Sequence, residues 1–153
     1  DNPDNANVVA FPPLIVGGFL VLELVIHFVY PVSVIPRSLG PWLGTPLILL
    51  SGLIVVSAFR ALRRGETTFD VRKSTTHIVS DGVFQYSRNP MYLSLLLLYG
   101  GLAFLINSVW LLVATIPLAV VIQKGVIERE EQYLRRKFGE EYVCYVKRVR
   151  RWI

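Results

Sequence analysis

The sequence predicts an all-α integral membrane protein with four transmembrane helices, and three observations support this fold class. The 153 residues are 53% hydrophobic and 18% charged, with a mean hydropathy of +0.50, whereas average soluble domains carry about 25% charged residues. The apolar residues cluster in four segments, each close to the ~20 residues needed to cross a hydrocarbon core of ~30 Å. The charged residues gather between and after these segments. A chain of this length suits one membrane-embedded domain over residues 1–153.

The predicted spans cover residues 12–30, 44–62, 91–106 and 109–127. The third span is short, and its start is indicated by Asn89-Pro90. Proline costs nothing in the first turn of a helix and Asn is a common cap, so we expect this helix to begin at Pro90 with Asn89 capping it. Only Asn107-Ser108 separate the third and fourth spans, which predicts a tight helical hairpin.

The basic residues predict the orientation of the spans. Thirteen of the sixteen Lys and Arg fall in three clusters: Arg60, Arg63 and Arg64; Arg72 and Lys73; and Arg129, Arg135, Arg136, Lys137, Lys147, Arg148, Arg150 and Arg151. Positive residues mark the cytosolic side of membrane proteins, so the second and fourth spans end in the cytosol, both termini are cytosolic, and loop 31–43 faces outward. The compact chain suggests a prokaryotic inner or plasma membrane. The N-terminus, with no basic region before the first span, is not typical of a secretory signal.

Two polar segments, 66–90 and 128–153, are left on the cytosolic side. Long connections without regular structure are usually functional. In the second segment acids precede bases, which suits a helix whose dipole they complement. Gly139 then predicts a helix stop, and residues 140–152 an amphipathic helix at the membrane interface. A basic tail can also bind nucleic acid, but this one follows a span directly and alternates with acids, so we expect no nucleic-acid partner.

Three groups of residues are candidates for chemistry. Arg88, at the start of a span, either extends to lipid phosphate or helps to bind a carboxylate at a helix N-terminus. Glu128, Glu130 and Glu131 repel one another at a membrane border; they either pair with Arg135 or recognise a cationic ligand group. Ile78-Val79 form either an apolar plug or a wall for an adenine ring.

Other groups point away from several chemistries. His77 lies far in the sequence from Cys144 and from His27, so no metal site is indicated. Glu23 and His27 lie four residues apart in the first span, where they serve either a function or a structural contact between helices. Cys144 is the one cysteine, so no disulfide forms within the chain. Soluble nucleotide-binding motifs such as GxGxxG and the P-loop are absent.

The order of the polar motifs resembles that of the isoprenylcysteine carboxyl methyltransferase and phospholipid methyltransferase family. The matching stretches are Ile78-Val79-Ser80, Gly82-Val83-Phe84, Arg88-Asn89-Pro90-Met91-Tyr92, Glu130-Glu131-Gln132-Tyr133-Leu134 and Phe138-Gly139-Glu140-Glu141-Tyr142-Val143-Cys144-Tyr145. They cover about half of the chain, on either side of the helical hairpin. Each motif alone is modest, but all of them in this order are specific.

The resemblance implies an enzyme that uses S-adenosylmethionine and releases S-adenosylhomocysteine, with a cytosolic cofactor pocket formed by the loop and the C-terminal helices. The implied cofactor-binding residues are His77, Ile78, Val79, Gly82, Tyr86, Arg88, Asn89, Pro90, Tyr92, Glu130 and Glu131. Ile78 and Val79 would contact adenine, and Arg88 to Tyr92 would surround ribose and methionine. Glu130 and Glu131 would hold the amino end or orient the acceptor.

The methyl acceptor is left open as a membrane lipid or lipophilic small molecule. Thr76 stands where carboxyl methyltransferases usually have a His, His77 is shifted by one position, Asn89 replaces the commoner His, and four spans are fewer than usual. An amine acceptor needs a base, for which Glu131 is the candidate; a carboxylate acceptor needs a cation such as Arg135; a thiol acceptor is also possible. The alternative from another class is a non-catalytic small membrane transporter or a lipid-binding assembly protein. A transporter should carry polar residues near the middle of several spans, whereas the charged residues of this sequence gather between and after the spans.

Overall fold

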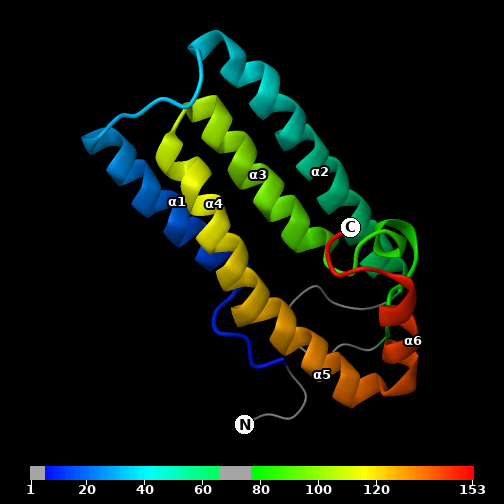
Figure 1. Ribbon diagram of the computed structural model, residues 1–153. Coiled ribbons are helices and arrows are strands. Elements are labelled where there is room, and N and C mark those ends of the chain that lie inside the picture. Colours follow the sequence, from blue (N-terminus) through cyan, green and yellow to red (C-terminus); the bar gives the residue numbers. More distant parts are fainter. Residues whose placement is uncertain (1–5, 66–76) are drawn as a thin grey trace.

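The computed structural model of the protein describes residues 6–65 and 77–153. The apolar helices in these residues are α1 (Pro12–Val29), α2 (Gly40–Arg64), α3 (Pro90–Ile106) and α4 (Val109–Ile122). They run alternately in opposite directions and lie in the order α1, α4, α3, α2 across the bundle (Figure 1). The predicted all-helical architecture is confirmed for the described part of the chain, which contains helices and turns but no strand.

Within residues 6–65 and 77–153, three helices are long and apolar enough to cross a membrane. They are α1, the stretch Arg37–Arg64, which joins the short helix η1 (Arg37–Leu39) to α2, and the stretch Val109–Phe138. α3 is a shorter apolar helix of 17 residues, about 25 Å long at 1.5 Å per residue. The predicted third span, residues 91–106, therefore stays a prediction. Residues 66–76, which include the predicted basic pair Arg72-Lys73 and Thr76, and residues 1–5 lie outside the described part.

The second apolar helix begins earlier than the sequence predicted. It starts at Gly40, and Pro41 lies in its first turn, where the missing N–H would have no partner in any case. The link from α1 to α2 is correspondingly shorter than residues 31–43. Gly40 and Gly44 let α2 approach α3 closely, because a Cβ on Gly44 would lie 2.6 Å from the Gly101 carbonyl oxygen.

The α3–α4 turn is tight, as predicted, and it also holds the link from α1 to α2. Asn107 adopts a left-handed conformation with φ +58°, and the Ser108 side chain accepts a hydrogen bond from the Leu111 N–H. The Asn107 side-chain oxygen accepts from the Val34 and Ile35 N–H groups at 2.9 and 3.1 Å. The two links therefore lie at the same end of the bundle.

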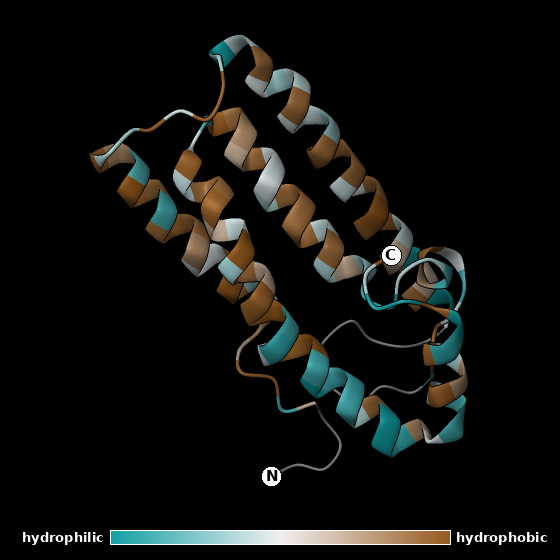
Figure 2. Cartoon of the chain, in the orientation of Figure 1, coloured by the Kyte–Doolittle hydropathy of each residue, from teal (hydrophilic) through white to brown (hydrophobic). Residues whose placement is uncertain are grey.

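α4 continues without a break into the polar end of the protein. A π-helical segment, η3 (Gln123–Ile127), joins it to α5 (Glu128–Phe138), and the Glu128 N–H bonds to the Gln123 carbonyl five residues back. Gly139, with φ +53°, ends α5 at the predicted position. Figure 2 shows the hydrophilic residues gathered on α5 and the next helix, and the hydrophobic residues on the four-helix bundle.

The last helix, α6 (Glu140–Arg148), is shorter than the predicted helix 140–152. Val149 has an extended backbone, with φ −123° and ψ 132°, so the chain leaves the helix there. The remaining residues turn back toward the start of α3, where the Arg150 carbonyl accepts a hydrogen bond from the Arg88 N–H at 3.0 Å. The tail after α6 therefore lies at the polar end of the bundle, together with α5 and α6.

Candidate functional site

A small pocket lies where the end of α2, residues 77–89, and helices α5 and α6 meet. Its volume is about 90 Å³. The lining residues are Leu62, His77, Ile78, Val79, Phe84, Arg88, Asn89, Glu130, Glu131, Leu134, Tyr142 and Tyr145. A second hollow of about 370 Å³ shares His77, Ile78 and Val79 with it, so this short segment is a wall common to both.

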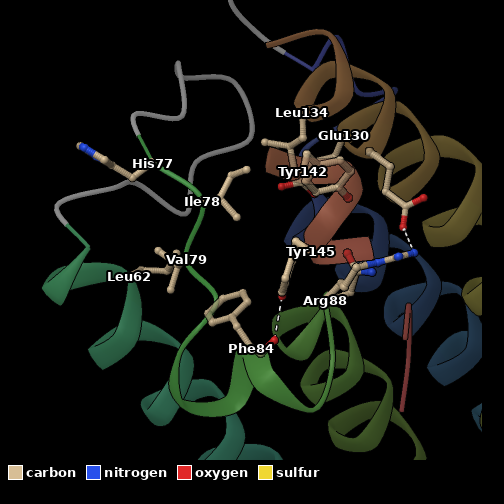
Figure 3. A pocket seen from close by; sticks show the side chains of 12 residues that line it. Leu62, His77, Ile78, Val79, Phe84, Arg88, Glu130, Leu134, Tyr142 and Tyr145 are labelled. Carbon is tan, nitrogen blue, oxygen red and sulfur yellow. Dashed lines mark hydrogen bonds and ion pairs between the residues drawn. The ribbon is translucent and has the colours of Figure 1, made fainter. Parts of the chain in front are cut away.

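One side of the pocket is apolar and aromatic. Figure 3 shows Ile78 and Phe84 directed toward the pocket, whereas the ring of His77 points away from it. Ile78 and Leu134 also pack against a buried cluster that contains Tyr142 and Tyr145. The Tyr145 hydroxyl donates to the Phe84 carbonyl at 2.8 Å, which ties α6 to the short helix η2 (Gly82–Gln85). Such a wall suits a flat apolar ring.

Arg88 supplies the positive charge of the pocket. Its side chain is 8% exposed. One terminal nitrogen donates to Glu131 at 2.8 Å and the other to the Val146 carbonyl at 3.3 Å. The Nε group is buried and has no hydrogen-bond partner among the described residues. A buried donor without a partner costs about 1–3 kcal/mol, so an anionic or polar ligand group that reached this N–H would remove that cost.

Glu131 is shared by two guanidinium groups rather than paired with Arg135. Besides Arg88, it accepts from Arg151 through both oxygens, with Nε–Oε1 at 3.1 Å and Nη2–Oε2 at 2.8 Å. Fork-shaped contacts of this kind are among the stronger hydrogen bonds in proteins. Glu131 is 6% exposed. Removing one partner of a buried ion pair typically costs about 3–5 kcal/mol, so this network fixes α5 against the start of α3.

Glu130 lies in a different environment from its neighbour. Its Oε2 accepts a hydrogen bond from the Tyr92 hydroxyl at 2.8 Å. Burial raises the pKa of Glu130 to about 7, and the nearby Glu131 charge adds to the rise, although the Tyr92 hydrogen bond opposes it. Two adjacent carboxyl groups therefore have distinct properties: Glu131 is held by two cations, whereas Glu130 titrates near neutral pH.

Asn89 and Pro90 begin α3, as the sequence predicts, but Asn89 does not cap it with its side chain. The helix starts at Pro90 with no side-chain capping bond from Asn89. The Asn89 amide instead donates to the Arg151 carbonyl at 3.0 Å, and the Ser87 hydroxyl reaches the same oxygen at 3.4 Å. The Asn89 side chain thus bonds to the C-terminal tail instead of to the first turn of α3.

The predicted site residues separate into three groups. Seven of them line the pocket: His77, Ile78, Val79, Arg88, Asn89, Glu130 and Glu131. Tyr92 contacts the lining residue Glu130, and Pro90 is buried but is not among the lining residues. Gly82, Tyr86 and Arg135 are not among the lining residues; Gly82 forms a turn with φ +57°, and Tyr86 is 75% exposed.

Sequence reasoning did not assign several residues of the site. They are Leu62, Phe84, Leu134, Tyr142, Tyr145 and Arg151. Tyr142 and Tyr145 belong to the Phe-Gly-x-x-Tyr-x-x-Tyr stretch, so the motif itself was a signal that could have placed them here. Arg151 gave no local signal, because its contacts depend on a tail that leaves the helical conformation.

A comparison with protein families decides the affiliation of the chain. Residues 39–141 match the model of the phospholipid methyltransferase family. The chain belongs to this family. The match includes the pocket segments from α2 through η2 and α3 to α5, but not Tyr142 and Tyr145 of α6, and it confirms the resemblance found in the sequence motifs. A methyltransferase family and several apolar helices together indicate a membrane methyltransferase.

Two curated relatives extend the comparison of this phospholipid methyltransferase family member. Protein-S-isoprenylcysteine O-methyltransferase B of Arabidopsis thaliana is 31% identical over 111 residues, which are 69% of this chain and 55% of the relative. The chain thus spans about half the length of that relative. An uncharacterized protein of Haemophilus influenzae is 49% identical over 65 residues, which are 41% of this chain and all of that protein.

Proposed function

We propose that this chain is an integral membrane methyltransferase that transfers a methyl group from S-adenosylmethionine to a lipophilic acceptor at the cytosolic leaflet. The observation that carries the proposal is Arg88, which lines a pocket with an apolar wall at the polar end of a membrane-type helix bundle and whose buried Nε has no partner in the described part of the chain. The family of the chain supports the reaction. The acceptor is a carboxylate, an amine or a thiol.

The types of residue at the pocket fit the chemistry of the cofactor. The apolar wall, with Ile78, Val79 and Phe84, suits the adenine ring. The free Arg88 N–H suits the carboxylate of the methionine part. Glu131 and Glu130 suit its amino group. The other cofactor-binding residues predicted above, which are His77, Gly82, Tyr86, Asn89, Pro90 and Tyr92, stay part of the proposal.

The pocket must widen to hold a ligand of this size. Its volume of about 90 Å³ is below the ~300–1,000 Å³ typical of small-molecule sites. The wall formed by residues 77–79 also borders the second hollow of about 370 Å³. An outward movement of this wall would join the two spaces, so we expect ligand binding to displace it.

When bound, S-adenosylmethionine supplies a methyl group that is already activated by its sulfonium. The chain therefore needs chiefly to position the acceptor and to remove a proton from it. An amine or thiol acceptor must lose a proton, and Glu130 or Glu131 could accept it. The geometry favours Glu130, because both Glu131 oxygens are occupied by arginines. For a carboxylate acceptor, the predicted role of Arg135 stays a prediction.

Calorimetric titration of the detergent-purified protein with S-adenosylmethionine tests this function. We expect wild-type protein to bind with micromolar affinity, and Arg88→Met and Glu131→Gln to lose most of that affinity. Arg136→Met, which removes an exposed charge of α5 away from the pocket, is the matched control and should bind normally. Absence of binding by well-folded wild type, with and without added lipid, would overturn the proposal.

A further inference from the structure

Arg151 is a feature of the site that neither the sequence motifs nor the family explains. Its side chain contacts α5, where it forms the fork with Glu131 and lies 3.5 Å from a Glu128 oxygen. Its backbone carbonyl accepts from Asn89 and Ser87 beside Arg88. One residue thus joins Glu131 to the two neighbours of Arg88, Ser87 and Asn89, although it does not itself line the pocket.

The charges around Glu131 show why a second cation is needed. Three acids, Glu128, Glu130 and Glu131, lie within four positions at the start of α5. Glu131 is almost fully buried, so its charge is poorly solvated and repelled by its neighbours. Arg88 alone supplies one contact to a single oxygen. Arg151 supplies two further contacts and is the cation that engages the second oxygen.

The orientation of Arg88 depends on this arrangement. Its guanidinium is held between Glu131 and the Val146 carbonyl, and its Nε has no partner among the described residues. The backbone of Arg88 is held by the Arg150 carbonyl, which belongs to the same tail. If Glu131 were to turn away or lose its charge, the Arg88 side chain would lose its strongest anchor.

We infer that Arg151 is a positioning residue: it fixes the Glu131 carboxylate, and thereby holds the Arg88 guanidinium in the orientation that binds the anionic end of the cofactor. The inference rests on the proposed function, because it assigns Arg88 to a cofactor carboxylate. Arg151 is 32% exposed in its side chain and acts through two other residues rather than by contact.

The test measures binding of S-adenosylhomocysteine by calorimetry, which requires no turnover. In Arg151→Met we expect the Kd to rise at least about tenfold, as the loss of charge-assisted hydrogen bonds produces. Arg151→Lys keeps the charge but not the fork, so its Kd should lie between those of the wild type and Arg151→Met. Arg150→Met is the matched control, since it removes an exposed neighbouring charge and keeps the backbone carbonyl, and its Kd should stay unchanged.

A double-mutant cycle separates positioning from a general structural role. If Arg151 acts through Arg88, then Arg151→Met should change the Kd by less than about twofold in a protein that already carries Arg88→Met. Equal effects in both backgrounds would overturn the inference, and so would an unchanged Kd in folded Arg151→Met. Thermal unfolding of each variant identifies those that fold. Should Arg151→Met fail to fold, the same comparison made with Arg151→Lys decides the question.

The outcomes also separate this inference from the proposed function. Wild-type protein that binds S-adenosylhomocysteine while Arg151→Met binds equally well contradicts only the role of Arg151. Folded wild type that binds neither S-adenosylhomocysteine nor S-adenosylmethionine contradicts the proposed function, and the role of Arg151 falls with it.

Discussion

Adjacent residues of the site can differ sharply in their chemistry. Glu130 and Glu131 follow one another on α5, yet Glu131 contacts two arginines and Glu130 contacts the Tyr92 hydroxyl. Because burial raises the Glu130 pKa to about 7, this side chain can exchange a proton near neutral pH, whereas its neighbour serves as an anchor.

The raised pKa predicts how stability depends on pH. Between pH 4.5, the ordinary pKa of a Glu, and about 7, the folded protein holds a proton on Glu130 that the unfolded chain has released. This contribution to the free energy of unfolding is therefore present at low pH and is lost as the pH rises through that window. Thermal unfolding from pH 4.5 to 8 should show a fall in wild type that is smaller in Glu130→Gln. Parallel curves would contradict the assignment.

Tyr92→Phe provides a second prediction about the same carboxyl group. The Tyr92 hydrogen bond favours the charged form of Glu130 and so lowers its pKa. Removing the hydroxyl should move the titration midpoint of Glu130 above 7. Infrared spectra of the carboxyl stretch over pH, with Glu130→Gln to identify the band, would measure the shift. A midpoint that falls instead would show that the hydroxyl does not stabilise the carboxylate.

For single residues, the sequence predicted which side chains belong to the site better than it predicted which side chains contact one another. Arg88 and Glu131 were both expected at the site, but their direct pairing spans 43 positions of sequence and has no local signal. One of the two interpretations of Glu131 paired it with Arg135, because residues four apart on a helix are neighbours. The structure shows arginines from α3's start and from the tail in its place, since only the tertiary fold brings them there.

Among the elements, α2 and α3 share an extensive helix contact, and two glycines of α2 allow a direct comparison. Gly44→Ala would place a methyl 2.6 Å from a backbone oxygen of α3, whereas Gly52→Ala meets no atom within 4 Å. We expect Gly44→Ala to lower the free energy of unfolding by about 1–3 kcal/mol, as overpacking typically does. Gly52→Ala should leave it equal or raise it by roughly 0.5–1 kcal/mol, since Ala favours helices. Chemical denaturation in detergent measures both, and equal effects would contradict this packing.

The elements also show where local signals suffice. Pro90, Gly139 and the Asn107-Ser108 turn act through backbone geometry, and helix boundaries lie where these residues predict them. The predicted helix 140–152 ends early because the carbonyls of Arg150 and Arg151 accept bonds from residues 87–89. The chain has already left the helix where these bonds form, and no sequence pattern within the tail predicts them.

In the whole molecule, the polar groups that form the pocket and those that hold the α1–α2 link lie at opposite ends of the helix bundle. The pocket, α5 and α6 lie at one end, and Asn107 marks the other, where it binds the α1–α2 link. α3 connects these two ends (Figure 1). Four spans, with the pocket in the cytosol as the basic residues predict, stay a prediction.

Cys144 offers a direct test of that orientation. It is the one cysteine of the chain, it is exposed, and it lies on α6. A membrane-impermeant maleimide should label it in inverted vesicles and leave it unlabelled in intact cells. In Cys144→Ser combined with Ser33→Cys, which places the thiol in the exposed α1–α2 link, the pattern should reverse. Labelling of both positions from the same side would contradict four spans.

The π-helical segment Gln123–Ile127 determines the direction around the helix axis in which Glu130 and Glu131 of α5 project, relative to α4. A π turn holds one residue more than an α turn, and one residue corresponds to about 100° of rotation. Deleting a single residue there would restore an unbroken α-helix and swing Glu130 and Glu131 away from Arg88, with hardly any change in composition. A chimera in which α4 is replaced by the corresponding helix of a relative would therefore need to keep this extra residue, so that Glu130 and Glu131 still face Arg88.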